Sequence, residues 1–280
     1  MEAVTYGDWV ASSEDRIDIV TAAMAQRLHS LLDTPSPAPA LGDPLPPLWH
    51  WLAFLPDAPQ AQIGPDGHPF KGGFLPPVEL PRRMFVGGRY HFDGHLGIGE
   101  MLTRHGEVTA IKVKEGSTGK LVFVTVTFTT SGAHGSVREE QDIVYREAAT
   151  ARVPAASGDP DQQPVWDFEF SLDPTPPLLM RFSALTYNAH RIHYDRDWAV
   201  NEEAYPGLVV HGPLQAIAIA EVLRRHYPDK VLEHFEFRST RPAFDGNPLR
   251  FKGRVEGLEA SVGAYNHLDQ VTTQGSGHFA

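Results

Sequence analysis

The densest group of polar side chains in this 280-residue chain lies in residues 186–197, which have the sequence TYNAHRIHYDRD. The group comprises Asn188, His190, Arg191, His193, Asp195 and Asp197. Histidine changes its charge near neutral pH, so a segment of this composition has the side chains that transfer protons to and from water. Polar segments are also common as solvated loops, and for an arbitrary cluster the two interpretations carry about equal weight.

A second motif, the sequence VVHGPL at residues 209–214, lies at the start of a predicted helix. Pro213 suits the first helical position, and the first turn of a helix has unpaired N–H groups and the positive end of the helix dipole. Since proline has no N–H, Gly212 is the expected donor, with Leu214 as a second. Such donors stabilise the negative charge that a thioester carbonyl gains in an enolate. Without a ligand, the motif is a helix start with a tight backbone approach at Gly212.

The histidines also allow a metal-site interpretation. His190 and His193 are three residues apart, and His91, Asp93 and His95 alternate along the chain. The His-Glu-x-x-His signature of zinc hydrolases is absent from the sequence, and there is no cysteine to supply a thiolate ligand. We therefore predict no metal site.

Two further patterns have ordinary explanations. Gly87 and Gly88, like the sequence GHLGIG at residues 94–99, lack the βαβ context of a dinucleotide-binding fingerprint. The aromatic run WHWLAF at residues 49–54 could line an acyl or adenine pocket, but such a run is more often part of a core or a domain interface. Neither pattern leads us to predict a cofactor.

The elements that must position the two motifs are a helix and a sheet. Residues 213–226 are rich in Ala and Ile and predict a helix that is buried on nearly every side. A strand is predicted at residues 166–172, and extended segments are predicted at 231–244, 248–257 and 259–279. A sheet of this length must cover its apolar face, and the helix is the candidate cover. The C-terminal half is therefore predicted to be an antiparallel sheet wrapped around one helix.

The N-terminal half has a similar order of elements. A helix is predicted at residues 14–32, with Ser13 as its cap, and a Pro-rich connector at 35–47 follows it. The sequences VTAIKVKEG and KLVFVTVTFTTSG predict a hairpin with a turn at Gly116, Ser117, Thr118 and Gly119, and residues 141–146 predict one more strand. No fixed-period repeat relates the two halves, so the duplication is inferred from the order of elements alone.

Composition limits the class of protein. Residues 150–165 are small, polar and Pro-rich, and they predict a linker between modules at 1–150 and 160–280. A net charge of −11 without a Lys/Arg block argues against nucleic acid as a partner. No apolar run approaches the roughly 20 residues of a membrane helix, and the first ten residues lack the apolar region of a signal peptide. We expect a cytoplasmic protein that does not bind membranes.

The two motifs also carry a family resemblance. Residues 181–195, 205–215 and 235–253 resemble the MaoC-type hot-dog hydratases, and most of the chain is similar to the FAS1-like dehydratase-domain family that includes mesaconyl-C4-CoA (3-methylfumaryl-CoA) hydratases. The resemblance implies an α+β fold of two hot-dog modules in one chain. The first module would be degenerate in catalytic residues and would complete a tunnel for CoA and the acyl chain. The second would hold the active site.

The broad MaoC pattern is Asp-x-Asn-x-x-His, in which Asp and His handle the catalytic water. It places its histidine on His193, its aspartate on Asn188 and its asparagine on His190. The resemblance therefore implies that His193 takes a proton from water and that Asn188 holds this water, although an amide cannot act as a base. The form YNAHRIHYD is associated with the mesaconyl-type branch. The second acid or base is left open among His190, His211 and Asp195.

The resemblance implies an acyl-CoA hydratase that reversibly adds water to the conjugated double bond of a short dicarboxylic enoyl-CoA, with mesaconyl-C4-CoA converted to citramalyl-CoA. Gly212 and His211 would contact the thioester. Arg191 would either bind the substrate carboxylate or brace its own loop against Asp195 or Asp197. The alternative carboxylate partners are Arg181, Arg238 and Arg241.

The only small-molecule partner implied is the acyl-CoA substrate, and no cofactor is required. The sequence leaves a homodimer open. Two rival functions remain, a hot-dog thioesterase and a non-catalytic acyl-CoA binder. The absence of an aspartate at Asn188 is the one feature that favours the binder.

Overall fold

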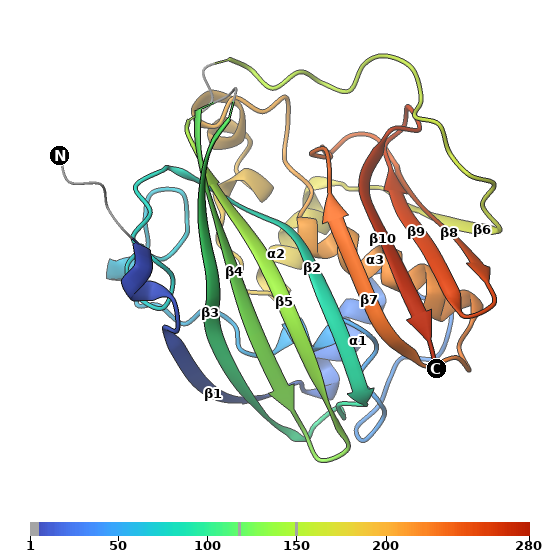
Figure 1. Cartoon of the computed structure of the whole chain (residues 1–280). Helices are drawn as coiled ribbons and strands as arrows, with labels where there is room; N and C mark the ends of the chain where they lie inside the picture. The colour runs from blue at the N-terminus through green and yellow to red at the C-terminus, as the bar shows by residue number, and fades with distance from the viewer. Residues whose placement is uncertain (1–5, 117–118, 149–150) are drawn as a thin grey trace.

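The computed structural model describes residues 6–116, 119–148 and 151–280. Within them, ten strands form one antiparallel sheet in the order β1-β3-β4-β5-β2-β7-β10-β9-β8-β6. The strands are β1 (Ser13–Ile19), β2 (Arg82–Gly94), β3 (Met101–Gly116), β4 (Gly119–Ser131), β5 (Gly135–Arg146), β6 (Phe168–Leu172), β7 (Leu232–Ser239), β8 (Leu249–Glu256), β9 (Glu259–Tyr265) and β10 (Val271–Phe279). The first five strands form one side of the sheet and the last five form the other (Figure 1).

Three α-helices lie behind the sheet in the view of Figure 1. They are α1 (Ala22–Leu31), α2 (Pro176–Leu185) and α3 (Gly212–His226). The short helical turns are η1 (Tyr6–Trp9), η2 (Trp49–Leu52), η3 (Gln60–Gln62), η4 (Arg191–His193) and η5 (Trp198–Glu202). The combination of a large antiparallel sheet with few helices confirms the predicted α+β class.

Helix α3 is the buried helix predicted at residues 213–226. All ten residues from Leu214 to Leu223 are buried, and the helix contacts β6, β8, β9 and β10. Glycine on the sheet allows this close approach, because a Cβ at Gly253 would lie 2.8 Å from Cγ1 of Val222. Each large apolar side chain that is buried contributes roughly 1.5–3 kcal/mol. Packing against the sheet therefore fixes the position of the α3 N-terminus.

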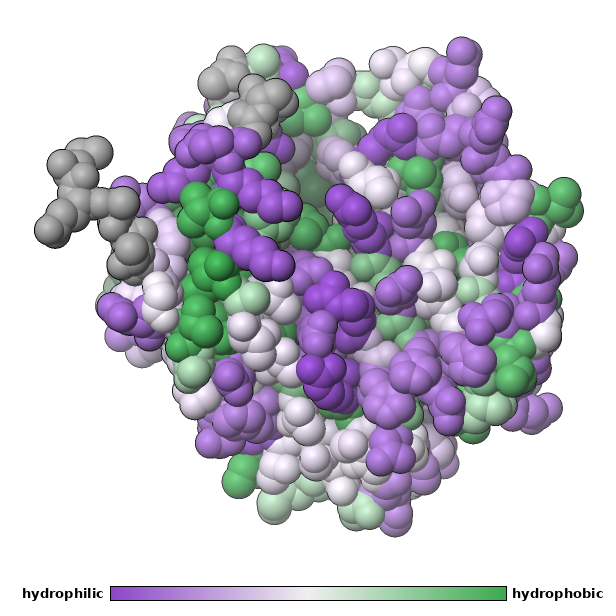
Figure 2. All heavy atoms as spheres, in the orientation of Figure 1, coloured by the Kyte–Doolittle hydropathy of each residue, from purple (hydrophilic) through white to green (hydrophobic). Residues whose placement is uncertain are grey.

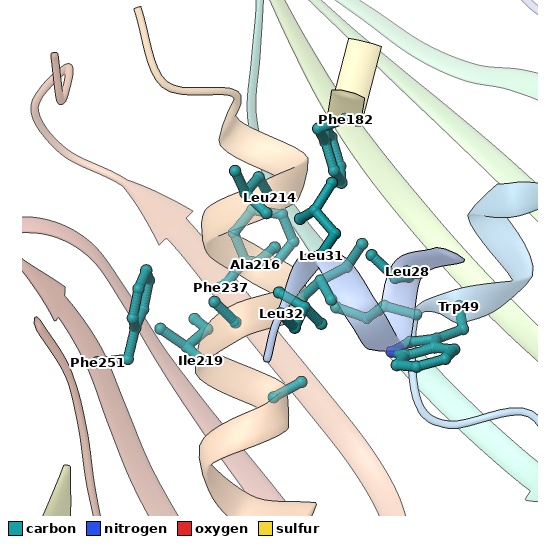
Figure 3. Close-up of a cluster of buried hydrophobic side chains, with 14 of the residues drawn as sticks. Leu28, Leu31, Leu32, Trp49, Phe182, Leu214, Ala216, Ile219, Phe237 and Phe251 are labelled. Atoms are coloured by element: carbon teal, nitrogen blue, oxygen red, sulfur yellow. The ribbon is translucent and has the colours of Figure 1, made fainter. Parts of the chain in front are cut away.

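Figure 3 shows the centre of this core, where side chains of α3 meet those of α1, α2 and the sheet. The labelled residues are Leu28, Leu31, Leu32, Trp49, Phe182, Leu214, Ala216, Ile219, Phe237 and Phe251. All of them belong to one contiguous buried cluster. The aromatic residue Trp49, from the run at residues 49–54, is thus part of the core, as its pattern favoured.

The two halves of the chain join where β2 pairs with β7, from Gly87 opposite Arg238 to His91 opposite His234. A Cβ at Gly87 would lie 2.6 Å from the carbonyl oxygen of Phe237. Gly87 therefore allows close approach of the two strands, and Gly88 leaves room for the side chain of Tyr90.

The helix predicted at residues 14–32 is wrong in its first half. Residues 13–19 form β1, which pairs with β3 from Ser13 opposite Glu107 to Ile19 opposite Met101. Helix α1 begins only after Thr21, whose Oγ1 accepts a hydrogen bond from the Met24 N–H at 3.2 Å. The residues before it alternate in exposure along the strand. Pairing with a distant strand outweighed the helical spacing of the apolar residues.

The other predicted elements are present. The hairpin is β3 with β4, although Ser117 and Thr118 of its turn lie outside the described residues, as do residues 1–5 and Thr150 of the predicted linker. Residues 151–165 contain no helix or strand. The division into modules at 1–150 and 160–280 stays a prediction. None of the helices in the described parts of the chain is long and apolar enough to cross a membrane.

Candidate active site

A cavity of about 1730 Å³ lies between the two halves of the chain. Its walls come from residues 50–75, the first residues of β2, the loop at 186–194 and the first turn of α3. Small-molecule pockets typically measure about 300–1,000 Å³, so this cavity has room for a large ligand. Figure 2 shows a recess with hydrophobic atoms between the upper ends of β5 and β7. Both polar motifs of the sequence contribute to the cavity.

His193, the predicted proton acceptor, lines the cavity at the end of η4 and is 7% exposed. Its Nδ1 lies 2.7 Å from the carbonyl oxygen of Val209. Since a carbonyl only accepts, Nδ1 carries the proton and Nε2 is left as the basic atom. Burial, assisted by the charge of His190, lowers the pKa of His193 to about 3. The ring is therefore neutral at neutral pH and able to accept a proton.

His211 supports His193 from behind. The two rings are stacked with 3.7 Å between their centroids, and Nε2 of His211 lies 2.8 Å from Oγ of Ser183. Its side chain is fully buried, which lowers its pKa well below the ordinary value. In the described residues, His211 is not part of the cavity wall. Its geometry therefore fits a role in positioning His193 better than the predicted contact with substrate.

Gly212 is the first residue of α3 and lines the same cavity as His193. Its N–H makes no hydrogen bond to a protein acceptor within the described parts of the chain. Gln215 N–H already bonds to the His211 carbonyl oxygen at 3.2 Å, so the free donor of the first turn that reaches the cavity is Gly212. Gly212 therefore stays the predicted donor to a thioester oxygen.

Asn188 lines the cavity after the end of α2. Its backbone N–H donates to the Ser183 carbonyl oxygen at 2.8 Å, and its Oδ1 accepts the His190 N–H at 3.0 Å. The side-chain oxygen therefore fixes the loop conformation, and the amide nitrogen is the atom left for a water molecule.

Arg191 braces its own loop. Its Nε and Nη2 donate to Oδ2 of Asp195 at 3.0 and 2.7 Å, and Nη1 donates to the Pro65 carbonyl oxygen at 3.1 Å. The guanidinium lies 4.0 Å from the centroid of the Trp198 ring. Of the two predicted roles of Arg191, the geometry favours the brace. It also occupies Asp195, one of the candidates for a second acid or base.

Three titratable residues near His190 were missed from the sequence: Asp66, His68 and Glu203. Oδ2 of Asp66 lies 2.9 Å from Nδ1 of His68, and the rings of His68 and His190 are 4.1 Å apart between centroids. Nε2 of His190 lies 3.9 Å from Oε1 of Glu203. The Asp-Gly turn in PDGHPF (65–70) was the available signal, but it marks a turn rather than a site.

The residues that come closest to a metal site are Asp66, His68 and His190, which place one potential ligand atom each within 4.8 Å of one another. The contact between Asp66 and His68 has the length of a hydrogen bond. It uses one ligand atom of each residue, so we interpret the cluster as an Asp–His pair in contact with His190.

Cationic side chains also line the cavity. They are Lys71, Arg82, Arg83, Arg104, Arg146, Arg191 and Arg241. Four of these form ion pairs: Arg82 with Glu203, Arg104 with Glu14, Arg191 with Asp195 and Arg241 with Asp161. Within the described ranges, Lys71, Arg83 and Arg146 have no carboxylate partner at ion-pair distance. Arg181 and Arg238 do not belong to the cavity wall as described.

Comparison with known sequences places these features in context. The profile of the family "Hydroxyacyl-thioester dehydratase type 2" matches residues 48–245. The chain is 47% identical over 259 residues to the mesaconyl-C(4)-CoA hydratase of Chloroflexus aurantiacus, covering 92% of this chain and 91% of that protein. It is 29% identical over 233 residues to the mitochondrial hydroxyacyl-thioester dehydratase type 2 of Schizosaccharomyces pombe, covering 74% and 76% of the two chains.

Solved structures share the fold. A MaoC-like dehydratase superimposes with a TM-score of 0.71 at 15% identity, over 99% of this chain and 100% of that one. A Mycobacterium tuberculosis protein with a double hot-dog fold gives a TM-score of 0.58 at 14% identity, over 97% and 96% of the chains. These similarities confirm the predicted double hot-dog fold.

Proposed function

The chain belongs to the hydroxyacyl-thioester dehydratase type 2 family, and from this premise we propose that it hydrates a short dicarboxylic enoyl-CoA, converting mesaconyl-C4-CoA to citramalyl-CoA. A hydro-lyase acting on acyl-CoA thioesters is the activity that the family and its relatives support. One observation carries the assignment to this cavity: the neutral, buried His193 and Gly212, whose N–H is free in the described residues, line the same cavity.

The geometry supports a mechanism in which these two groups act on the same substrate. The Gly212 N–H would donate to the thioester oxygen and stabilise the enolate that forms there. Nε2 of His193 would take a proton from a water molecule while the oxygen of this water bonds to the β-carbon of the substrate. The amide nitrogen of Asn188 would orient this water. Addition is complete when the α-carbon receives a proton, so one water molecule is consumed and nothing is released.

A dicarboxylic substrate is supported by the cations of the cavity. A carboxylate that leaves water needs a cationic partner, and arginine offers two parallel donors. Arg83 has no carboxylate partner in the described residues and is close enough to His68 to lower the pKa of that ring. We therefore assign the substrate carboxylate to Arg83 rather than to Arg191, whose donors are occupied.

Two substrates and two variants test this assignment. Arg83→Gln should cost about 2–3 kcal/mol in kcat/KM for mesaconyl-C4-CoA and little for crotonyl-CoA, which has no carboxylate. Arg191→Gln is the matched control and should lower kcat/KM for both substrates by a similar factor, because it loosens the whole loop. If Arg83→Gln lowers kcat/KM equally for both substrates, Arg83 binds the phosphates of CoA, which both substrates share, and not the acyl carboxylate. Wild-type preference for crotonyl-CoA would contradict a dicarboxylic substrate.

A further inference from the structure

Hydration needs a base for the water and an acid for the α-carbon, and Asn188 can be neither. We propose that His190 is this acid, and that Asp66 and His68 of the N-terminal half, together with Glu203, hold the proton on it. The inference rests on the proposed hydration and adds its proton donor. His190 would be a catalytic residue, and the three others would be positioning residues.

His190 lies where such an acid is needed. It lines the same cavity as His193 and is 8% exposed. The two rings stand at 88° to each other, with 5.4 Å between their centroids. Substrate bound against His193 would therefore also be within reach of His190. The two imidazoles can serve as separate acid and base only if their surroundings favour opposite protonation states.

The surroundings do differ in charge. Asp66 and Glu203 flank His190, and the pKa of each is lowered although burial alone would raise it. Contacts with His68 and His190 lower the pKa of Asp66, and contacts with His190 and Arg82 lower that of Glu203. Both carboxylates are thus ionised at neutral pH and place negative charge beside His190. His193 instead contacts the Val209 carbonyl and the neutral His211 ring, and no carboxylate of the described residues pairs with it.

Cations also lie in the surroundings of His190. Burial, assisted by Arg83, lowers the pKa of His68 to about 4, so that ring is neutral and adds no opposing charge. Arg82 shares Glu203 through a contact of 3.0 Å. Since His193 is neutral as well, it adds no positive charge next to His190. Two carboxylates therefore flank His190, one of them shared with Arg82, while Arg83 acts on the neighbouring His68.

The N-terminal half holds Asp66 and His68 in place by a fitted turn. The Arg191 N–H donates to the Asp66 carbonyl oxygen at 2.9 Å. Gly67 adopts a φ of +94°, and a Cβ there would lie 1.7 Å from the carbonyl oxygen of Ala189. Only glycine fits such a contact. The turn at residues 65–68 is therefore seated directly on the loop that carries His190.

The protons balance in this scheme. His193 takes one proton from water as the oxygen bonds to the β-carbon, and protonated His190 gives one proton to the α-carbon. The enzyme is then left with a proton on His193 and none on His190. Transfer of that proton between the neighbouring rings, directly or through water, restores the starting state.

A motif exchange gives the sharpest test. His190→Asn should lower kcat roughly 100- to 10,000-fold, as expected for loss of a general acid. The double variant Asn188→Asp with His190→Asn restores the Asp-x-Asn-x-x-His pattern and should recover much of the lost rate through the new carboxyl group. His68→Gln should cost at least about tenfold in the wild type but little in the double variant, because His68 acts through His190.

The pH profile separates this role from a structural one. Glu203→Gln should move the alkaline limb of kcat/KM to lower pH, because His190 loses its proton more readily without this carboxylate. An unmoved limb would contradict the positioning role of Glu203.

The proposal would be overturned if His190→Asn kept the kcat of the wild type, or if the folded double variant recovered none of the lost rate. It would also be overturned if His68→Gln lowered kcat equally in both backgrounds, or if the protein held a metal whose chelation abolished activity. Hydration by the wild type must be shown first, and its absence would contradict the proposed function instead.

Discussion

The two halves of the sheet are covered in different ways. In the C-terminal half, the 15-residue helix α3 lies against β8, β9 and β10 and is buried along most of its length. In the N-terminal half, the 10-residue helix α1 packs mainly against α2 and η2, and residues 50–75 line the cavity instead. The position of the helix thus decides whether the concave face of the sheet is filled or left for a ligand.

This difference assigns separate tasks to the two halves. The filled half fixes the N-terminus of α3 and with it Gly212 and His193. The open half supplies the volume of the cavity and the turn that contacts His190. Residues of the C-terminal half should therefore affect both stability and chemistry strongly, whereas the effects of the N-terminal half should depend on whether a residue touches the cavity or the core.

The largest effect is expected at His193. His193→Gln should lower kcat on the best enoyl-CoA roughly 100- to 10,000-fold with a modest change in KM, because proton transfer is lost while substrate contacts remain. Steady-state kinetics measure both constants. Turnover close to that of the wild type would remove the base from the mechanism.

The next largest effect is expected on stability, where truncating a buried side chain of α3 should cost more than truncating one of α1. Ile219→Ala in α3 should lower the free energy of unfolding by about 2–5 kcal/mol, because it leaves a cavity in a core with no exposed surface. Met24→Ala in α1 should cost less, since Met24 is only partly buried. Urea denaturation of both variants measures the comparison. A larger loss in Met24→Ala would contradict the view that α3 organises the core.

The buried carboxylate of Glu139, in the N-terminal half, should make the free energy of unfolding depend on pH. Glu139 is 1% exposed and accepts a hydrogen bond from Nε1 of Trp51 at 2.9 Å. Burial would raise its pKa, but His50 and Trp51 lower it below the ordinary 4.5. A depressed pKa in the folded state contributes stability above the unfolded pKa and loses it as the pH falls through the folded value.

Glu139→Gln should therefore cost roughly 1–3 kcal/mol at pH 7, and the difference from the wild type should shrink below about pH 4.5. Unfolding free energies measured between pH 7 and pH 3 give this difference. A gap that widens toward acid would mean that Glu139 is protonated in the folded protein.

The smallest effect is expected at a solvent-exposed ion pair of the same half. Asp57 pairs with Arg16 at 2.9 Å, and its side chain is 83% exposed. Arg16 also donates to the carbonyl oxygens of Phe54 and Leu55. Asp57→Asn should change the free energy of unfolding by less than about 1 kcal/mol. A larger loss would show that this loop helps to hold the open half together.

The parts of the fold that follow local patterns could be predicted from the sequence. The apolar pattern of α3 and the alternation in β3 and β4 are consequences of burial on one or more faces, which short windows of sequence record. The strand β1 could not be found in this way. Its pairing with β3 joins residues about ninety positions apart, and its apolar side chains also fit a helical spacing.

The candidate site divides in the same way. His193 and Gly212 lie in motifs with a recognisable pattern, and both line the same cavity in the structure. Asp66 and His68 come from one turn and Glu203 from another loop, and their contact with His190 arises only in three dimensions. The bracing of Arg191 likewise depends on Pro65, more than a hundred residues away.

The measurement that tests the central claim most directly is the product formed from mesaconyl-C4-CoA. The wild-type protein should convert it to a thioester heavier by one water molecule, as shown by mass spectrometry, and a thiol reagent should detect no free CoA. His193→Gln should form this product far more slowly. Release of free CoA would identify a thioesterase, and tight binding without any change of the substrate would identify an acyl-CoA binder; either result would contradict hydration at His193.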